Sequence, residues 1–162
     1  MARYLTTQEV LFVHERLLAR TGGAPGIRDV SLLEAALNRP KAVSGGSEVY
    51  ATLAGKGAIL MYSLVLNQLF IDGNKRLGLV CLDLFLRLNQ VKLTADAAAR
   101  YEFLCAVADE ALSLEQMTNW VETHSEPAKA APEARRRTRA TPARRVSVAP
   151  LDPSRLGLDH EQ

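Results

Sequence analysis

The middle of the chain, residues 50–76, reads YATLAGKGAILMYSLVLNQLFIDGNKR. Its apolar part, from Tyr50 to Leu69, is too long for one β-strand and too uniformly apolar for a surface helix, which predicts a central buried helix. A polar turn from Phe70 to Asn74 interrupts the apolar pattern. Because a second apolar run extends from Lys75 to about Leu88, the stretch predicts two buried helices joined by a short polar loop.

On the N-terminal side, two shorter segments carry helix start and stop signals. The residues from Thr6 to Glu9 form a capping box ahead of a helix that Gly22-Gly23 ends. The residues from Ser31 to Glu34 repeat this pattern and predict the start of a short second helix. Pro40 closes that helix because proline cannot continue the hydrogen-bond ladder.

On the C-terminal side, a short extended piece is expected at residues 91–93, followed by two more helices. The first is predicted from about Asp96 to Leu112, and the second from Ser113 to His124, opened by the capping box of Ser113 and Gln116. With almost no strand pattern elsewhere, the sequence predicts an all-α domain, a compact bundle of about six helices.

Composition excludes several classes of protein. The chain has 162 residues, 48% hydrophobic and 23% charged, with a formal net charge of +2, which is typical of a globular domain. The longest apolar stretch, residues 58–66, is well short of the roughly 20 residues that a membrane span needs. The N-terminus shows no apolar signal core, so a cytoplasmic location with no membrane partner is expected. Cys81 and Cys105 form no CxxC pair, which argues against a disulfide framework and a structural metal site.

The last 38 positions differ from the rest of the chain. Residues 125–162 hold eight basic and five acidic side chains and are rich in Ala, Pro and Arg. Such a segment buries too little apolar surface to offset its ordering entropy, so we expect a domain at residues 1–124 and a disordered tail at 125–162. Six Arg between Arg135 and Arg145 are compatible with nucleic-acid binding, with a plain solvated extension, or with docking of residues 146–158 on the domain.

The polar loop carries the chemistry. A glycine turn that opens a helix presents unpaired backbone N–H groups at the positive end of the helix dipole, which favours phosphate. Lys75 and Arg76 are unfavourable to that dipole unless an anion is present. Asp72 offers an oxygen ligand for Mg²⁺, and Asn74 can donate to phosphate or cap the helix. The alternative is a turn whose charges only reach solvent, and spacing alone leaves both open.

The residues from Gln68 to Arg76 resemble the signature loop of the Fic/Doc superfamily, His-x-Phe-x-(Asp/Asn)-(Gly/Ala)-Asn. The continuation Lys75-Arg76 is similar to the Doc (death on curing) branch, whereas Fic nucleotidyltransferases continue Gly-Arg-x-x-Arg. The segment from Gly22 to Asp29, GGAPGIRD, is similar to the Gly-Gly-x-Pro-Gly-x-Arg-Asp segment of Doc-like proteins. The resemblance covers roughly residues 3–124.

This resemblance implies a toxin of a bacterial toxin–antitoxin module with the Fic/Doc fold. Doc proteins act like kinases: ATP, bound in an orientation inverted relative to Fic enzymes, donates its γ-phosphoryl group to a threonine of elongation factor Tu, which stops translation. The implied cofactors are ATP and Mg²⁺. The implied partners are a Phd-like antitoxin, elongation factor Tu as the target, and operator DNA only through the antitoxin complex.

The resemblance also implies a role for each motif residue. Asp72 would hold Mg²⁺, while Gly73, Asn74 and the start of the following helix would form an anion hole. Lys75 and Arg76 would contact the nucleotide phosphates, and Phe70 would anchor the loop from inside. Outside the motif, His14 is expected to be a packed or solvated histidine and Arg28-Asp29 a surface pair, structural or facing the target.

One position departs from the family pattern. The general-base histidine falls at Gln68, whose amide is not basic near neutral pH. Loss of a general base costs about 100-fold to 10,000-fold in rate, so we expect this chain to be inactive or impaired. Two alternatives stay open: a Fic-like nucleotidyltransferase that transfers AMP, and a non-catalytic module that holds an antitoxin or nucleic acid.

Overall fold

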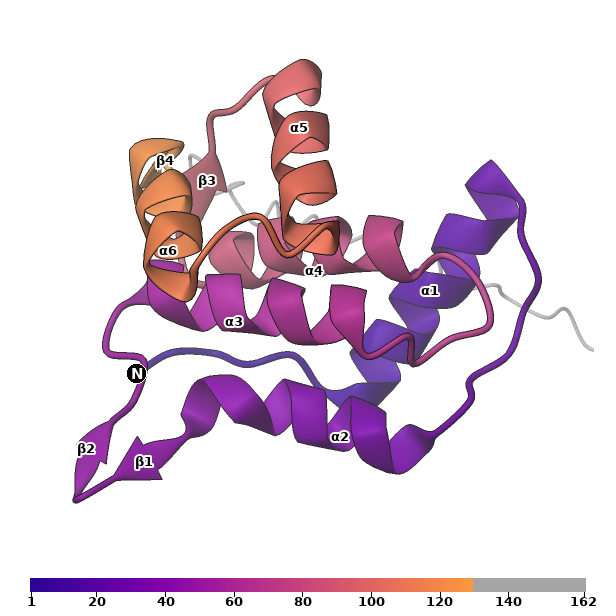
Figure 1. The fold of residues 1–162 in the computed structure, drawn as a ribbon, viewed down its shortest axis with the longest axis horizontal. Coiled ribbons are helices and arrows are strands. Elements are labelled where there is room, and N and C mark those ends of the chain that lie inside the picture. The colour runs from indigo at the N-terminus through magenta and orange to yellow at the C-terminus, as the bar shows by residue number, and fades with distance from the viewer. Residues whose placement is uncertain (130–162) are drawn as a thin grey trace, which may run out of the picture. The chain divides into compact units, whose positions relative to one another are not determined.

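Helices α3 (Leu53–Leu66) and α4 (Asn74–Leu88) form the centre of the fold and lie side by side (Figure 1). The computed structural model describes residues 1–129. Helix α3 is buried along almost its whole length, as its apolar sequence predicts, although it is shorter than the run from Tyr50 to Leu69. At Gly78 of α4, an added Cβ would lie 2.5 Å from Cγ2 of Val65, so glycine is required for the close approach of the two helices.

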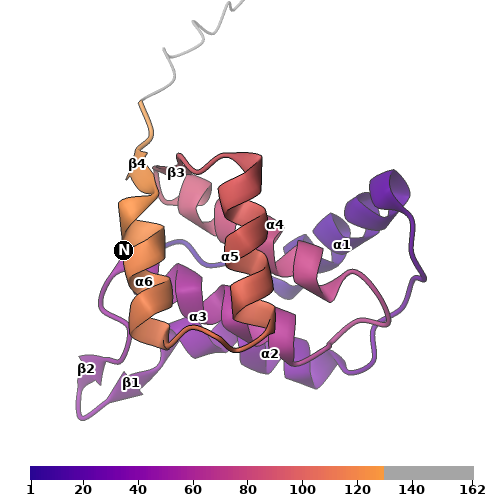
Figure 2. The same ribbon diagram turned by 45° about the horizontal axis from the view of Figure 1, so that its top comes forward.

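The other helices cover this central pair. Helix α2 (Val30–Asn38) and the 3-10 helix η1 (Arg39–Lys41) contact α3 from one side, and α5 (Ala97–Ala108) and α6 (Leu114–Thr123) contact it from the other (Figures 1 and 2). Helix α1 (Thr7–Thr21) contacts α4 and α2. Residues 1–129 therefore contain six α-helices, and the prediction of a mostly helical bundle is confirmed.

Two small antiparallel pairs of strands complete these residues. Strands β1 (Val43–Ser44) and β2 (Ser47–Glu48) form a hairpin, and β3 (Val91–Leu93) pairs with β4 (Ser125–Pro127). The extended piece predicted at residues 91–93 is β3. Strand β4 lies beyond His124, inside the segment that the sequence assigned to a tail. The Arg cluster and residues 146–158 lie outside the described residues.

Side chains cap the N-termini of five of the six α-helices in residues 1–129. The capping residues are Thr6, Asp29, Thr52, Asp96 and Ser113. The capping boxes predicted at Thr6 and Ser113 are confirmed. Helix α4 differs because it begins at Gly73, which has no side chain, and its N-terminus shows no side-chain cap within the described structure.

Two predicted helix boundaries are wrong. The N-cap of α2 is Asp29 and not Ser31 of the predicted capping box, because the Asp29 carboxylate accepts the N–H groups of Ser31 and Leu32. Helix α5 ends at Ala108 and does not continue to Leu112. Its chain turns at Glu110, which has a φ of 53° in the left-handed region.

Two further observations concern the buried Cys81 and the length of the helices. Cys81 is completely buried in α4, and burial raises the pKa of its thiol to about 12, so it is a neutral core residue. Across residues 1–129, none of the helices has both the length and the apolar character needed to span a bilayer.

Candidate active site

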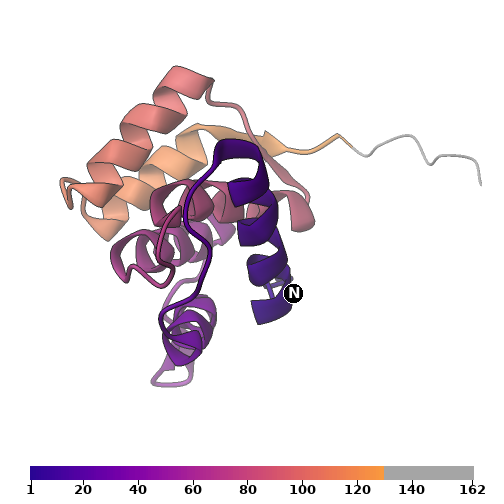
Figure 3. The same ribbon diagram turned by 90° about the vertical axis from the view of Figure 1, so that its right-hand side faces the viewer.

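Two connections that are far apart in the sequence lie next to each other at one end of the fold (Figures 1 and 3). The segment between α1 and α2 pairs with the loop between α3 and α4 through an antiparallel bridge of Ile27 and Phe70. The N–H of Arg28 donates to the carbonyl of Leu69 at 2.7 Å, and the N–H of Ile71 donates to the carbonyl of Gly26 at 3.0 Å. The two sequence motifs thus form one structural unit.

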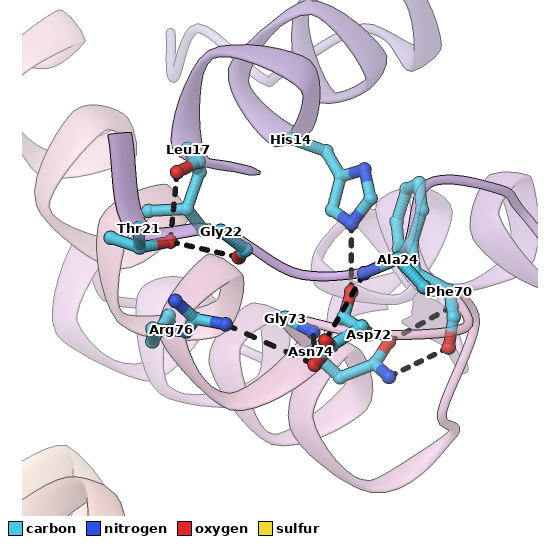
Figure 4. Close-up of polar contacts among 10 residues, drawn as sticks. All are labelled: His14, Leu17, Thr21, Gly22, Ala24, Phe70, Asp72, Gly73, Asn74 and Arg76. Carbon is cyan, nitrogen blue, oxygen red and sulfur yellow. Dashed lines mark hydrogen bonds and ion pairs between the residues drawn. The ribbon is translucent and has the colours of Figure 1, made fainter. Parts of the chain in front are cut away.

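The Asn74 side chain closes the α3–α4 loop (Figure 4). Its Oδ1 accepts the N–H of Phe70 at 2.9 Å, and its Nδ2 donates to the carbonyl of Phe70 at 2.8 Å. Asn74 therefore does not cap α4 with its side chain, one of the two roles expected from the sequence. It fixes the loop geometry instead, and its backbone N–H belongs to the first turn of α4.

Phe70 and His14 support the loop from inside. Phe70 is 1% exposed, and its ring stacks on the His14 imidazole with 3.8 Å between ring centroids. His14 is 5% exposed and its Nε2 lies 2.8 Å from the backbone oxygen of Asp72. Because a carbonyl oxygen only accepts, His14 donates from Nε2. The sequence did not connect His14 to the loop, although its spacing of four residues from buried Val10 places it on the inner face of α1.

Asp72 links the loop to its surroundings. Its Oδ1 accepts the N–H of Gly73 at 2.7 Å, and its Oδ2 accepts the N–H of Ala24 at 3.3 Å. The Arg76 guanidinium lies 3.9 Å from Oδ1 across one helical turn. These contacts orient a carboxylate whose side chain remains about half exposed.

Gly23 makes room for Asp72. Its φ is 128°, a conformation that favours glycine, and an added Cβ would lie 2.7 Å from the Asp72 Oδ2. The glycines of the GGAPGIRD segment therefore serve the neighbouring loop as well as their own turn. Asp29 of the same segment caps α2, which is a structural role, and its side chain is exposed.

The start of α4 is electrostatically unusual. Lys75 and Arg76 lie in its first turn and no acidic residue does. Asp72 accepts the N–H of the N-cap Gly73, but within residues 1–129 no side chain caps the N–H groups of Asn74, Lys75 and Arg76. Two cations at the positive end of a helix dipole are unfavourable by about 0.3 to 1 kcal/mol each. Lys75 is exposed and Arg76 half-exposed, so both can reach a bound anion.

The predicted residues meet at one open groove of about 370 Å³. Its polar wall comes from the motif: Gln68, Asp72, Gly73, Asn74, Lys75 and Arg76. Its remaining wall is formed by Val65, Ile71, Tyr101 and Leu104. Gln68 is exposed at this groove with a φ of 45°. The structure thus brings six of the seven predicted site residues together, with Phe70 buried beneath them. Tyr101 and Leu104 on α5 carry no local motif, and the sequence did not indicate them.

The site offers one carboxylate for a metal ion. Among the described residues no group of three or more His, Cys, Asp or Glu side chains could hold a metal. Mg²⁺ commonly binds through one or two carboxylates together with substrate phosphates, and the exposed, oriented Asp72 fits that arrangement. An ion at this position would depend on the nucleotide for its remaining ligands.

A second, more apolar groove of about 450 Å³ lies beside α1. Its wall includes Leu11, Leu18 and Ile27, together with His14 and Phe70. The last two residues also support the loop. The α3–α4 loop therefore contributes to two grooves, through Phe70 to the apolar one and through the motif residues to the polar one.

Known proteins match the part of the chain that carries the α3–α4 loop and the GGAPGIRD segment. A model of the Fic/DOC family matches residues 4–86, which include α1, the GGAPGIRD segment and the α3–α4 loop. The chain is 38% identical over 96 residues to "Toxin Doc" of Mycolicibacterium smegmatis, covering 59% of this chain and 72% of that protein. It is 30% identical over 116 residues to "Protein kinase doc" of Escherichia phage P1, covering 66% of this chain and 91% of that protein.

Proposed function

The chain belongs to the Fic/DOC family, and on that premise we propose that it is a Doc-type toxin with a phosphotransferase site. In this proposal it transfers the γ-phosphoryl group of ATP to a threonine of elongation factor Tu and so blocks translation. The observation that carries the proposal is the uncapped start of α4, where Lys75, Arg76 and free N–H groups face one groove. Such a start is a ready phosphate site.

Each part of the loop has a role in this reaction. Phosphoryl transfer depends mainly on positioning and on stabilising charge on the transferred group. Lys75 and Arg76 would neutralise the nucleotide phosphates, while the N–H groups of the first turn of α4 hold their oxygens. Asn74, by fixing the backbone of Phe70, keeps those donors in place before the nucleotide binds. Mg²⁺, held by Asp72, would supply further positive charge at the phosphates.

Gln68 limits the chemical step. A threonine hydroxyl becomes a good nucleophile when a base removes its proton as the bond to phosphorus forms. The Gln68 amide oxygen can accept a hydrogen bond from that hydroxyl and orient it, but it cannot take the proton. We therefore propose that this chain binds nucleotide and target but transfers phosphate slowly or not at all.

The biochemical test uses the Gln68→His variant, elongation factor Tu, and ATP labelled at either the α or the γ phosphate. Label from the γ position is expected in the factor, with a rate about 100-fold to 10,000-fold above that of the unchanged chain. The matched control is Gln68→Asn, which offers no base and should stay as slow as the unchanged chain. Label from the α position alone would overturn the kinase proposal in favour of AMP transfer.

A growth test separates the enzyme from a binding module. Expression of Gln68→His in bacteria is expected to arrest growth, and the double variant Gln68→His/Lys75→Ala is expected to relieve the arrest.

The proposed antitoxin partner is Phd-like, and the apolar groove beside α1 suits an apolar peptide segment. If Gln68→His causes no arrest while purified antitoxin still binds, a non-catalytic module is the better description.

A further inference from the structure

The wall of the polar groove includes side chains that the proposed chemistry does not use. Helix α3 contributes Val65, and α5 contributes Tyr101 and Leu104. Val65 and Leu104 are buried, whereas Tyr101 is 67% exposed. One groove is therefore lined both by the cations of the motif, where phosphate would bind, and by an exposed aromatic ring.

Helix α5 holds this ring on a rigid support. It packs against both α3 and α4, the helices that carry the loop. Two residues beyond Tyr101, Phe103 is buried and stacks face to face on Trp120 of α6, with 3.8 Å between ring centroids. The Tyr101 hydroxyl interacts with the Cys105 thiol, one turn further along α5, and this contact raises the pKa of the hydroxyl above the ordinary value of 10.0. Tyr101 is thus positioned by packed helices and not by a loop.

We propose that Tyr101 is the residue on which the nucleobase of the bound nucleotide stacks. This inference rests on the proposed function, because it takes the phosphates to lie at Lys75 and Arg76. A purine nucleoside triphosphate combines an anionic chain with an aromatic base, and the groove wall combines two cations with an aromatic ring. Stacking on an aromatic ring tolerates different bases, so Tyr101 strengthens binding of ATP and GTP alike and is not a source of adenine selectivity.

The test compares two probes, ATP and inorganic tripolyphosphate, each with Mg²⁺, by calorimetric titration of the full chain. Tripolyphosphate has no base and reports on phosphate binding alone. The Tyr101→Ala variant should bind ATP about tenfold more weakly and tripolyphosphate as well as the unchanged chain does. Tyr101→Phe keeps the ring and should retain the affinity for ATP.

Two controls fix the interpretation. Phe12 on α1 is 61% exposed and outside the groove, so Phe12→Ala should bind both probes normally. Lys75→Ala should weaken the binding of both probes, since the Lys75 ammonium group would contact phosphate. Because Tyr101 is an exposed helical position and alanine is a good helix former, Tyr101→Ala is expected to remain folded.

Three results would overturn the inference while leaving the proposed function intact: unchanged ATP affinity of Tyr101→Ala, equal weakening of both probes by that substitution, or loss of ATP affinity in Tyr101→Phe. The first would leave the exposed ring available for contact with the target protein. If the unchanged chain binds neither probe, the nucleotide site itself is absent, and the proposed function fails together with the inference.

Discussion

Helices α1 and α4 have the same length, 15 residues, but opposite beginnings. Helix α1 starts with a complete capping box, and Glu9 in its first turn favours the helix dipole. Helix α4 starts at a glycine without a cap, and Lys75 and Arg76 oppose the dipole. The first arrangement stabilises a helix by itself, whereas the second is stabilised when an anion arrives.

The difference indicates that the start of α4 is less stable than it could be and is suited to binding an anion. The loop before α4 is held by hydrogen bonds to two buried residues that do not line the polar groove, from Asn74 to Phe70 and from His14 to Asp72. The N–H groups and cations on the groove side are left for a ligand. Substitutions at the two helix starts should therefore affect stability and nucleotide binding in different proportions.

The largest effect on stability is expected from Asn74→Ala. It removes both hydrogen bonds to Phe70 and leaves two polar backbone groups unpaired, which costs about 1 to 3 kcal/mol for each group. ATP binding should be lost as well, because the loop no longer presents its donors. The measurements are urea denaturation and nucleotide titration.

Its counterpart at α1 is Thr6→Ala, which removes the hydroxyl that accepts the N–H of Glu9, at a cost of about 1 kcal/mol. ATP binding of this variant should be unchanged. If Thr6→Ala weakens ATP binding as strongly as Asn74→Ala does, the two helix starts do not differ in function.

The next effect concerns Gly23, where the end of α1 meets Asp72. Gly23→Ala places a Cβ 2.7 Å from the Asp72 Oδ2 and adds strain at a φ of 128°, so we expect a loss of about 1 to 3 kcal/mol. Gly45→Ala is the control, since Gly45 also has a positive φ but no neighbour within 4 Å. Gly23→Ala should also weaken Mg²⁺-dependent ATP binding, because it displaces the Asp72 carboxylate. If the dependence of ATP binding on Mg²⁺ is unchanged in this variant, the proposal that Asp72 holds the metal ion is contradicted.

A reciprocal exchange at the second position of each helix tests the dipole directly. Lys75→Gln should stabilise the fold by about 0.3 to 1 kcal/mol, and Gln8→Lys should destabilise it by a similar amount. Only Lys75→Gln should weaken ATP binding. Thermal denaturation at low ionic strength measures the stability changes, and a loss of stability in Lys75→Gln would contradict the proposed electrostatics of α4.

The smallest effect is the pH dependence of the α1 start. The hydrogen bond from the N–H of Thr6 is the main cause that lowers the pKa of Glu9 below its ordinary value of 4.5, assisted by Arg3. Since the folded state then binds the proton less tightly than the unfolded state, this contribution to stability is present above pH 4.5 and is lost as the pH falls through the lowered pKa. Glu9→Gln should flatten the dependence in acid denaturation curves, and an unaltered curve would contradict this cause.

Much of the fold could be predicted because local sequence patterns determine its helices and turns. The apolar run of α3, the capping boxes at Thr6 and Ser113, and the glycine turn before α4 each act within a few residues. The predicted start of α2 was wrong because Asp29 and Ser31 are both good capping residues. The choice depends on the preceding chain, which the hydrogen bond from Arg28 to Leu69 holds in place.

The site could be predicted less completely. The motif named the residues of the polar wall, but their contacts are tertiary: no periodicity indicates that Gly23 meets Asp72 or that His14 stacks on Phe70. Asn74 illustrates the limit, because an amide can serve a ligand or its own backbone equally well in sequence. The position of Tyr101 at the groove could not be predicted for the same reason, since only the packing of α5 brings it there.

The most direct measurement follows the backbone amide signals of both helix starts by NMR as ATP and Mg²⁺ are added to the full chain. The N–H groups of Asn74, Lys75 and Arg76 are expected to shift progressively to saturation, while those of Gln8 and Glu9 in α1 stay in place. Unshifted signals at the start of α4, or equal shifts at both helices, would contradict the claim that α4 begins in a phosphate-binding site.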